Sequence, residues 1–274
     1  MSFDLKTYRI EILAGLTVAM TMIPESLSFA IVAGLPPLTG LYGAFIMGII
    51  TAILGGRPGM ISGGAGATVI VMIALIVTHG IEYFFAAVVL AGLFQVIVGV
   101  FKLGKFVRLV PQPVMYGFLN GLAVVIFMSQ LDQFKLKTGL QSTWLQGESL
   151  YIMGGLVALT LALVYFIPKI SKALPTTLIA IAVIFCIVHF FNIDTKTVQD
   201  IASISGGFPP FHIPEIPLNF DTLEIIFPYA AIMAGVGLLE SLLTLTLVDE
   251  VTESRGNANK ESVAQGIANI ANGF

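Results

Sequence analysis

Long apolar stretches without charges alternate with short polar segments along most of this chain. A helix needs about 20 apolar residues to cross the hydrocarbon core of a bilayer, so stretches of this kind predict membrane spans. We place the spans at residues 12–33, 37–55, 61–79, 83–101, 111–131, 150–168, 174–191 and 223–248, followed by a weakly apolar segment at 262–274. A polar, proline-rich connector covers residues 192–221. The pattern therefore predicts an all-α polytopic membrane protein.

The third of these spans differs from the others because glycines crowd its beginning, at Gly59, Gly63, Gly64 and Gly66. Glycine weakens a helix and lets the backbone approach a ligand closely. We expect the helix to begin near Gly66, which leaves about 14 residues, or roughly 21 Å, in a hydrocarbon core of roughly 30 Å. A helix that begins inside the membrane offers free N–H groups and the positive end of its dipole. The segment therefore predicts an anion site of the kind that carriers use.

Composition supports the membrane assignment and argues against other classes. Hydrophobic residues make up 57% of the chain and charged residues 11%, whereas soluble domains carry about 25% charged residues. The single cysteine, Cys186, excludes a disulfide within the chain, and the three histidines have no metal-ligand spacing. No nucleophile, base and acid stand in a catalytic pattern. We therefore expect no enzyme, no cofactor, no metal and no nucleic-acid partner.

The positions of lysine and arginine predict the orientation. With the N-terminus in the cytoplasm, only Lys135, Lys137 and Lys196 of the 13 basic residues fall outside. Such an excess of basic residues on the cytoplasmic side is typical of membrane proteins. We expect a multi-pass protein of the plasma (inner) membrane with a cytoplasmic N-terminus.

A short internal repeat suggests how the spans are organised. Glu25-Ser-Leu in the first span matches Glu240-Ser-Leu in the eighth. An odd number of spans separates the two copies, so the second copy must cross the membrane in the opposite sense. This predicts an inverted repeat, with the first repeat at residues 1–222 and the start of the second at residues 223–274.

Glu25 and Glu240 are the carboxylates that lie well inside the predicted spans. Charge is costly there, so such acids usually line a cavity or bind ions, although an acid near a span end can also reach water. Glu240 could load and release a proton, or it could hold Na⁺ together with Ser241 and with Thr244 on the same helix face. Either cation would remove the repulsion between the acid and a bound anion, and so couple the two.

Two further residues are candidates for the anion site. Thr68 can donate a hydroxyl hydrogen bond near the start of the half-helix, and helix capping is the alternative interpretation. Phe29 lies one helical turn beyond Glu25 and could form a wall of the pocket, while ordinary packing is the alternative.

Several segments resemble the SulP family of inorganic anion transporters, the sulfate permease family. They are Ala14-Gly-Leu-Thr-Val-Ala19, Ile23-Pro-Glu-Ser-Leu-Ser-Phe-Ala30, Gly34-Leu-Pro-Pro-Leu-Thr-Gly-Leu-Tyr42, Gly56-Arg-Pro-Gly-Met-Ile-Ser62, Lys102-Leu-Gly-Lys-Phe106, Gly237-Leu-Leu-Glu-Ser-Leu-Leu243 followed by Asp249, and Gly266-Ile-Ala-Asn269. Their order and spacing extend the resemblance over essentially the whole chain.

The resemblance implies a fold of seven plus seven inverted spans, with a core domain and a gate domain. In that fold the third and tenth spans are half-helices that face each other around the anion. Matching positions place the anion near Glu25, Phe29, Ala65, Gly66, Ala67 and Thr68, and the coupling cation at Glu240 and Thr244. The family includes proton- and sodium-coupled symporters, exchangers and channel-like members, with sulfate, bicarbonate, chloride and dicarboxylates among their substrates.

Thr39 and Arg57-Pro58 depart from the usual family signature, which leaves the subfamily open. The chain ends at Phe274, where the tenth span should begin, and it has no STAS domain, so we expect a truncated form whose full-length version is a homodimer in membrane lipid. We expect secondary active transport of an inorganic anion, with sulfate first and H⁺ symport through Glu240. The alternatives are a bicarbonate or dicarboxylate transporter, driven by Na⁺ or by exchange, a channel-like anion conductor, and a membrane scaffold without transport.

Overall fold

The computed structural model describes residues 5–64, 66–109, 112–138, 141–170, 176–195, 197 and 207–274, and almost all of its regular structure is helical. The long elements are α1 (Leu5–Val32), α2 (Pro37–Leu54), α3 (Gly66–His79), α4 (Ile81–Val100), α5 (Gln112–Leu131), α6 (Glu148–Ile170), α7 (Thr176–Phe190), α9 (Phe220–Thr252) and α10 (Ala258–Asn272). The short ones are the 3₁₀ helices η1 (Leu103–Leu109) and η2 (Asp132–Phe134) and the strands β1 (Lys135–Thr138) and β2 (Gln141–Trp144). This confirms the predicted all-α class.

The helix bounds follow the predicted spans closely. Within the described ranges, five helices are long and apolar enough to cross a membrane, namely α1, α2, α4, α6 and α9. A shorter apolar helix covers Ile179–Phe190. The spans predicted at 37–55 and 111–131 correspond to α2 and α5 to within a residue at each end.

The chain folds into two compact units, and α1 and α5 each contribute to both. Unit 1 contains Met1–Pro24 and Val124–Ser203, and unit 2 contains Glu25–Ala123 and Ile204–Phe274. The predicted boundary between the repeats at residues 222 and 223 falls in the first turn of α9. The inverted symmetry of the two repeats stays a prediction.

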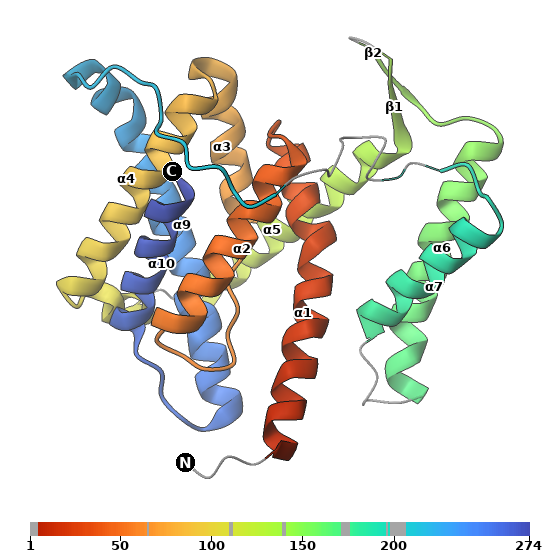
Figure 1. Ribbon diagram of the computed structural model, residues 1–274, viewed down its shortest axis with the longest axis horizontal. Coiled ribbons are helices and arrows are strands. Elements are labelled where there is room, and N and C mark those ends of the chain that lie inside the picture. The colour runs from red at the N-terminus through yellow and green to blue at the C-terminus, as the bar shows by residue number, and fades with distance from the viewer. Residues whose placement is uncertain are drawn as a thin grey trace. The chain divides into compact units, whose positions relative to one another are not determined.

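In unit 1, α6 and α7 form an antiparallel pair that lies side by side (Figure 1). The strands β1 and β2 pair antiparallel, with Lys135 opposite Trp144. The Lys135 ammonium lies 5.3 Å from the centre of the Trp144 ring, a cation–π distance. The sequence predicts only an outer loop around Lys135 and Lys137, so the hairpin is an addition to the predicted fold.

In unit 2, α10 packs against α4, α2 and α9 (Figure 1). Small residues make this close packing possible, because short side chains let helix backbones approach each other. The alanines at the helix contacts are almost completely buried: Ala87, Ala91, Ala230, Ala234, Ala264 and Ala268. Close packing therefore joins four helices, α2, α4, α9 and α10, and this bundle holds the segments that connect them.

The α4 and α10 backbones come close together at Gly92 of α4 and Gly266 of α10. A Cβ atom added to Gly266 would lie 2.6 Å from the carbonyl oxygen of Gly92, and one added to Gly92 would lie 2.6 Å from the carbonyl oxygen of Gly266. Both neighbours are backbone atoms, which cannot move aside as a flexible side chain can. The crossing therefore requires glycine on both helices.

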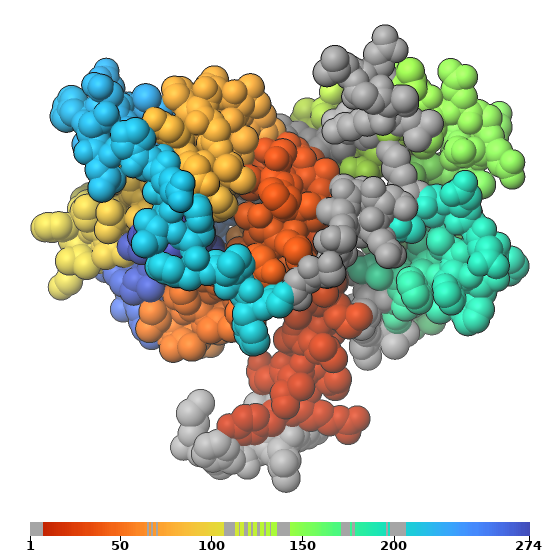
Figure 2. Space-filling view, turned by 45° about the horizontal axis from the view of Figure 1, so that its top comes forward, coloured from red at the N-terminus to blue at the C-terminus, as the bar shows by residue number. Residues whose placement is uncertain are grey.

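The end of the connector before α9 runs over the surface of α2 and α4 (Figure 2). The Tyr42 hydroxyl donates a hydrogen bond to the Gly207 carbonyl. The Glu82 carboxylate of α4 lies 2.8 Å from the His212 ring nitrogen and accepts from the Glu215 N–H. The described part of the connector is irregular, as its prolines predict.

The Gly92–Gly266 crossing gives a test of the packing in unit 2. We expect Gly266→Ala to destabilise the protein by about 1–3 kcal/mol, because the added methyl group overpacks the crossing. The measurement is thermal unfolding of the detergent-solubilised protein. Gly48→Ala in α2 is the matched control, since a Cβ there meets nothing within 4 Å, and alanine favours the helix. Equal melting temperatures for the two variants would contradict this packing.

Candidate functional site

The half-helix is present and has the predicted bounds. The segment from Gly55 to Gly64 is not helical, and α3 begins at Gly66 and ends at His79 after 14 residues. At 1.5 Å per residue this helix is roughly 21 Å long, shorter than the roughly 30 Å hydrocarbon core. A helix of this length inside a membrane span would begin within the hydrocarbon core, where the protein must supply partners for its first N–H groups.

The start of α3 is buried in unit 2. Gly66 is buried and Thr68 is 6% exposed, and α3 packs against α4 and α9. Ala65 and the side chain of Ala67, which the family resemblance also assigned to the anion site, lie outside the described part of the structure. The described residues thus place two of the predicted anion-site residues, Gly66 and Thr68, at the half-helix N-terminus.

Phe29 of α1 lies beside the approach to this N-terminus. A Cβ atom added to Gly64 would lie 3.5 Å from the Phe29 ring, an ordinary van der Waals contact. Phe29 also packs against the apolar core of unit 2. The structure therefore brings Phe29 to the predicted site, where it also serves the packing that was its alternative role.

The two carboxylates predicted to lie in the membrane both belong to unit 2. Glu25 is exposed in this unit and Glu240 is half-buried. The Glu240 Oε2 atom is buried and has no hydrogen-bond partner among the described residues. A buried oxygen of this kind is costly to leave unpaired, so it is a good candidate for holding a proton or a cation.

Thr244 forms a hydrogen bond with the backbone of Glu240 but not with its carboxylate. Its hydroxyl is exposed and donates to the backbone carbonyl of Glu240 at 3.0 Å, rather than to the carboxylate. Glu240 and Thr244 thus lie one helical turn apart, as their spacing predicts, without a direct bond between their side chains.

One face of α10 carries polar residues that were not predicted to have a role. Glu261, Gln265 and Asn269 recur at every fourth position, and Glu261 and Gln265 are 2% and 6% exposed. Asn269 donates to the Oε1 atom of Gln95, a buried residue of α4. The period of four places these side chains on one helix face, which is the signal that could have revealed them in a weakly apolar segment.

Arg57 fastens the loop before α3 to the C-terminal end of α9. Its side chain is 7% exposed and its Nε atom lies 3.4 Å from Asp249 Oδ1. Its Nη2 atom donates to the hydroxyls of Thr252 and Ser254. Such a multiply bonded guanidinium fixes a loop through several donors at once.

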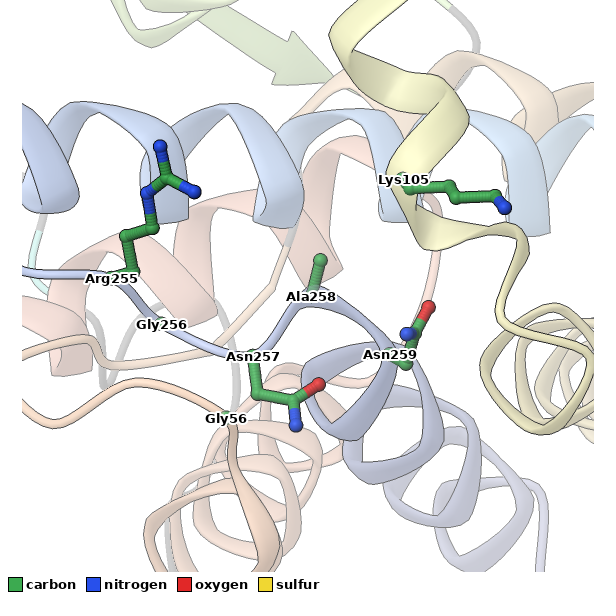
Figure 3. A pocket seen from close by; sticks show the side chains of 7 residues that line it. All are labelled: Gly56, Lys105, Arg255, Gly256, Asn257, Ala258 and Asn259. Atoms are coloured by element: carbon green, nitrogen blue, oxygen red, sulfur yellow. The ribbon is translucent and has the colours of Figure 1, made fainter.

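A hollow of about 490 Å³ lies at the turn between α9 and α10 (Figure 3). Its lining residues are Gly56, Lys105, Arg255, Gly256, Asn257, Ala258 and Asn259. Two of its lining residues are basic and come from different segments, Lys105 from η1 and Arg255 from the α9–α10 turn (Figure 3). Of the residues predicted to bind the anion and the coupling cation, those that the structure describes do not line this hollow.

Comparison with known proteins agrees with the family resemblance. The model of the sulfate permease family matches residues 9–274. The Bacillus subtilis protein named "Putative sulfate transporter YbaR" is 45% identical over all of this chain and 56% of its own length. The bicarbonate transporter BicA of Picosynechococcus is 31% identical over 98% of this chain and 51% of its own length.

A solved structure is similar over nearly the whole chain. The transmembrane domain of a cyanobacterial bicarbonate transporter BicA matches with a TM-score of 0.80 and 29% identity, covering 99% of this chain and 73% of that domain. The chain spans about half the length of the curated relatives it matches, and these relatives are named as transporters rather than enzymes. By its sequence and its fold, the chain belongs to the sulfate permease family.

Proposed function

We propose that this chain is the substrate-binding part of a secondary transporter that moves an inorganic anion across the membrane, with sulfate as the substrate. The observation that carries the proposal is the start of α3 at Gly66, within an apolar span and after an irregular loop. Its first N–H groups and the positive end of its dipole favour an anion at this position.

The groups around this N-terminus suit a small oxyanion. Backbone N–H groups from the first turn of α3 and the Thr68 hydroxyl supply hydrogen-bond donors, and the Phe29 ring supplies an apolar wall. Sulfate presents oxygen acceptors in every direction, so it can use several of these donors at once. The name of the Bacillus relative supports sulfate over other anions.

Bicarbonate is the second candidate substrate. The specific support for it is the TM-score of 0.80 to the transmembrane domain of a bicarbonate transporter. Both anions accept hydrogen bonds from N–H and hydroxyl groups, so direct competition in a transport assay decides between them.

Proton coupling through Glu240 completes the proposal. An ionised Glu240 would repel a bound anion and would also repel Glu25. A proton on Glu240 removes both repulsions and satisfies the unpaired Oε2 atom. Anion and proton would then bind more favourably together than separately, which is the thermodynamic requirement for symport. Na⁺ at Glu240 and Thr244 is the alternative coupling ion.

The cellular setting is part of the same proposal. We place the transporter in the plasma (inner) membrane with its N-terminus in the cytoplasm, because the basic residues predict that orientation. The complete protein is proposed to act as a homodimer. The binding and coupling residues named above all belong to unit 2.

Uptake by the complete protein in proteoliposomes tests the transport function. We expect saturable sulfate uptake, counterflow of labelled sulfate, and stimulation by an inward proton gradient, because one pH unit supplies about 1.4 kcal/mol per proton. Stimulation by Na⁺ instead would point to the alternative coupling ion. Unitary anion currents without counterflow would contradict a carrier, and stronger competition by bicarbonate than by unlabelled sulfate would favour the second candidate substrate.

Glu240→Gln tests the coupling. The amide cannot take up a proton, so we expect stimulation by the pH gradient to disappear while exchange of sulfate for sulfate continues. The measurement is labelled sulfate uptake at several imposed pH gradients. Glu250→Gln, at an exposed position on the same helix, is the matched control and should behave as the wild type. A Glu240→Gln protein with an unchanged pH response would show that the coupling group lies elsewhere.

Thr68→Val tests the anion site. Valine keeps the shape of threonine but removes the hydroxyl, so we expect the affinity for sulfate to fall about tenfold, as for a hydrogen bond to a charged group. Thr78→Val is the control at the other end of α3, where the hydroxyl donates to the Ala74 carbonyl. Gly66→Leu should block binding more severely. Normal sulfate affinity in both site variants would place the anion away from this N-terminus.

A further inference from the structure

The most deeply buried carboxylate of the described chain has no part in the proposed binding and coupling. Glu261, in the first turns of α10, is 2% exposed. Among the described residues it forms no ion pair with a lysine, arginine or histidine. A buried carboxylate is costly unless several donors surround it, so what surrounds Glu261 indicates why it is there.

Three donors from three segments satisfy this carboxylate. Gly56, just after α2, donates its backbone N–H to Oε2 at 2.8 Å. Ser241 of α9 donates its hydroxyl to Oε1 at 3.1 Å, and Gln265 of α10 donates its amide to the same oxygen at 3.0 Å. Hydrogen bonds to an ionised acceptor are the strong ones. Glu261 therefore joins α9, α10 and the loop before α3 at one buried point.

The Gln265 side chain extends this junction to the far end of the same loop. Its Nε2 atom is also hydrogen-bonded to the hydroxyl of Ser62 and lies 3.1 Å from that of Ser241. The loop is therefore held twice from one face of α10, at Gly56 directly by Glu261 and at Ser62 through Gln265. The Asn257 N–H, at the start of α10, donates to the Gly56 carbonyl and closes the junction.

This double attachment affects the half-helix, because Ser62 lies only four residues before Gly66, the first residue of α3. The position and direction of the first N–H groups of α3 depend on where this loop ends. The same junction contacts Ser241, the neighbour of Glu240 in sequence. One buried carboxylate thus links the segment that leads to the proposed anion site with the helix that carries the proposed coupling acid.

We infer that Glu261 is a positioning residue for the anion site: it holds the loop from Gly56 to Ser62 so that the first N–H groups of α3 converge on the bound anion. The inference rests on the proposed transport function. It differs from a merely structural role, because it requires the variant's defect to appear in the affinity for the anion.

The test is the concentration dependence of sulfate uptake by the complete protein in proteoliposomes. Glu261→Met keeps the length of the side chain and removes both acceptors. We expect the KM for sulfate to rise about tenfold, the effect of losing a hydrogen bond to a charged group, with the maximal rate per folded transporter changed much less. Glu261→Gln keeps one acceptor for the Gly56 N–H, so it should recover most of the affinity.

Asn269→Leu is the matched control, because it removes another polar contact of α10, the partly buried bond to Gln95, which lies away from the loop. It should lower the melting temperature while KM stays at the wild-type value. An unchanged KM in Glu261→Met, or an equal rise in Asn269→Leu, would overturn the positioning role. If Glu261→Met does not fold, Gln265→Leu decides. It removes the attachment to Ser62 and one donor to Glu261 but keeps the bond from Gly56 to Glu261, so it should raise KM about threefold.

The design separates this inference from the proposed function. Wild-type protein that carries bicarbonate instead of sulfate overturns the substrate alone, and the same KM comparison is then made with bicarbonate. Wild-type protein that carries neither anion overturns the proposed function. The remaining test is then equilibrium binding of sulfate, measured as stabilisation against heat, in which Glu261→Met should still need about tenfold more sulfate than the wild type.

Discussion

A backbone N–H group in the middle of a membrane must find a partner, because no water is available there. Most of this chain meets the requirement with helices that satisfy their own hydrogen bonds. The start of α3 at Gly66 does not, since the first N–H groups of any helix lack intrahelical acceptors. Several features of unit 2 are in keeping with a helix that begins there. A segment that interrupts a helix inside the membrane must be held in place by the surrounding helices, which serve as its frame. Its free N–H groups can also donate hydrogen bonds to a bound ligand.

The frame is built from close packing and from buried polar contacts, and the two have different roles. Gly92 and Gly266 let α4 and α10 touch at backbone distance, which gives dispersion contacts without any directional bond. Arg57 and Glu261 then fasten the loop before α3 at chosen atoms. Dispersion contacts alone would not fix the position of that loop, because they have no preferred direction. A charged group with fixed donors or acceptors removes this freedom, at the desolvation cost that buried charges carry.

The parts of this arrangement that depend on local sequence could be predicted. The glycine cluster before Gly66 predicted the position of the helix start because glycine disfavours helix wherever it stands, and the uncharged runs predicted the spans because a bilayer penalises charge independently of the fold. Glu25 and Glu240 were found for the same reason. Contacts between distant segments were not predicted. The bond from Gly56 to Glu261 joins residues that are far apart in the chain, and no local preference encodes it. The hairpin at β1 and β2 was missed because each strand has only four residues and one large apolar side chain, too little for a pattern to identify a strand. The roles of the predicted site residues stay predictions, since they concern a ligand rather than the fold.

The loop attachments also bear on how a transport cycle would proceed. Glu240 and the start of α3 belong to the same compact unit, and the contacts through Ser241 and Glu261 tie their segments together. A rearrangement that carries this unit across the membrane would therefore move the bound anion and the proton together, and the distance between them would stay unchanged. A proton on Glu240 neutralises that acid, so the loaded unit carries only the charge of the anion. A unit that holds the anion without the proton carries the Glu240 charge as well, which raises the electrostatic cost of its crossing. In this way a few hydrogen bonds that hold a loop would make movement of the anion without its driving ion unfavourable.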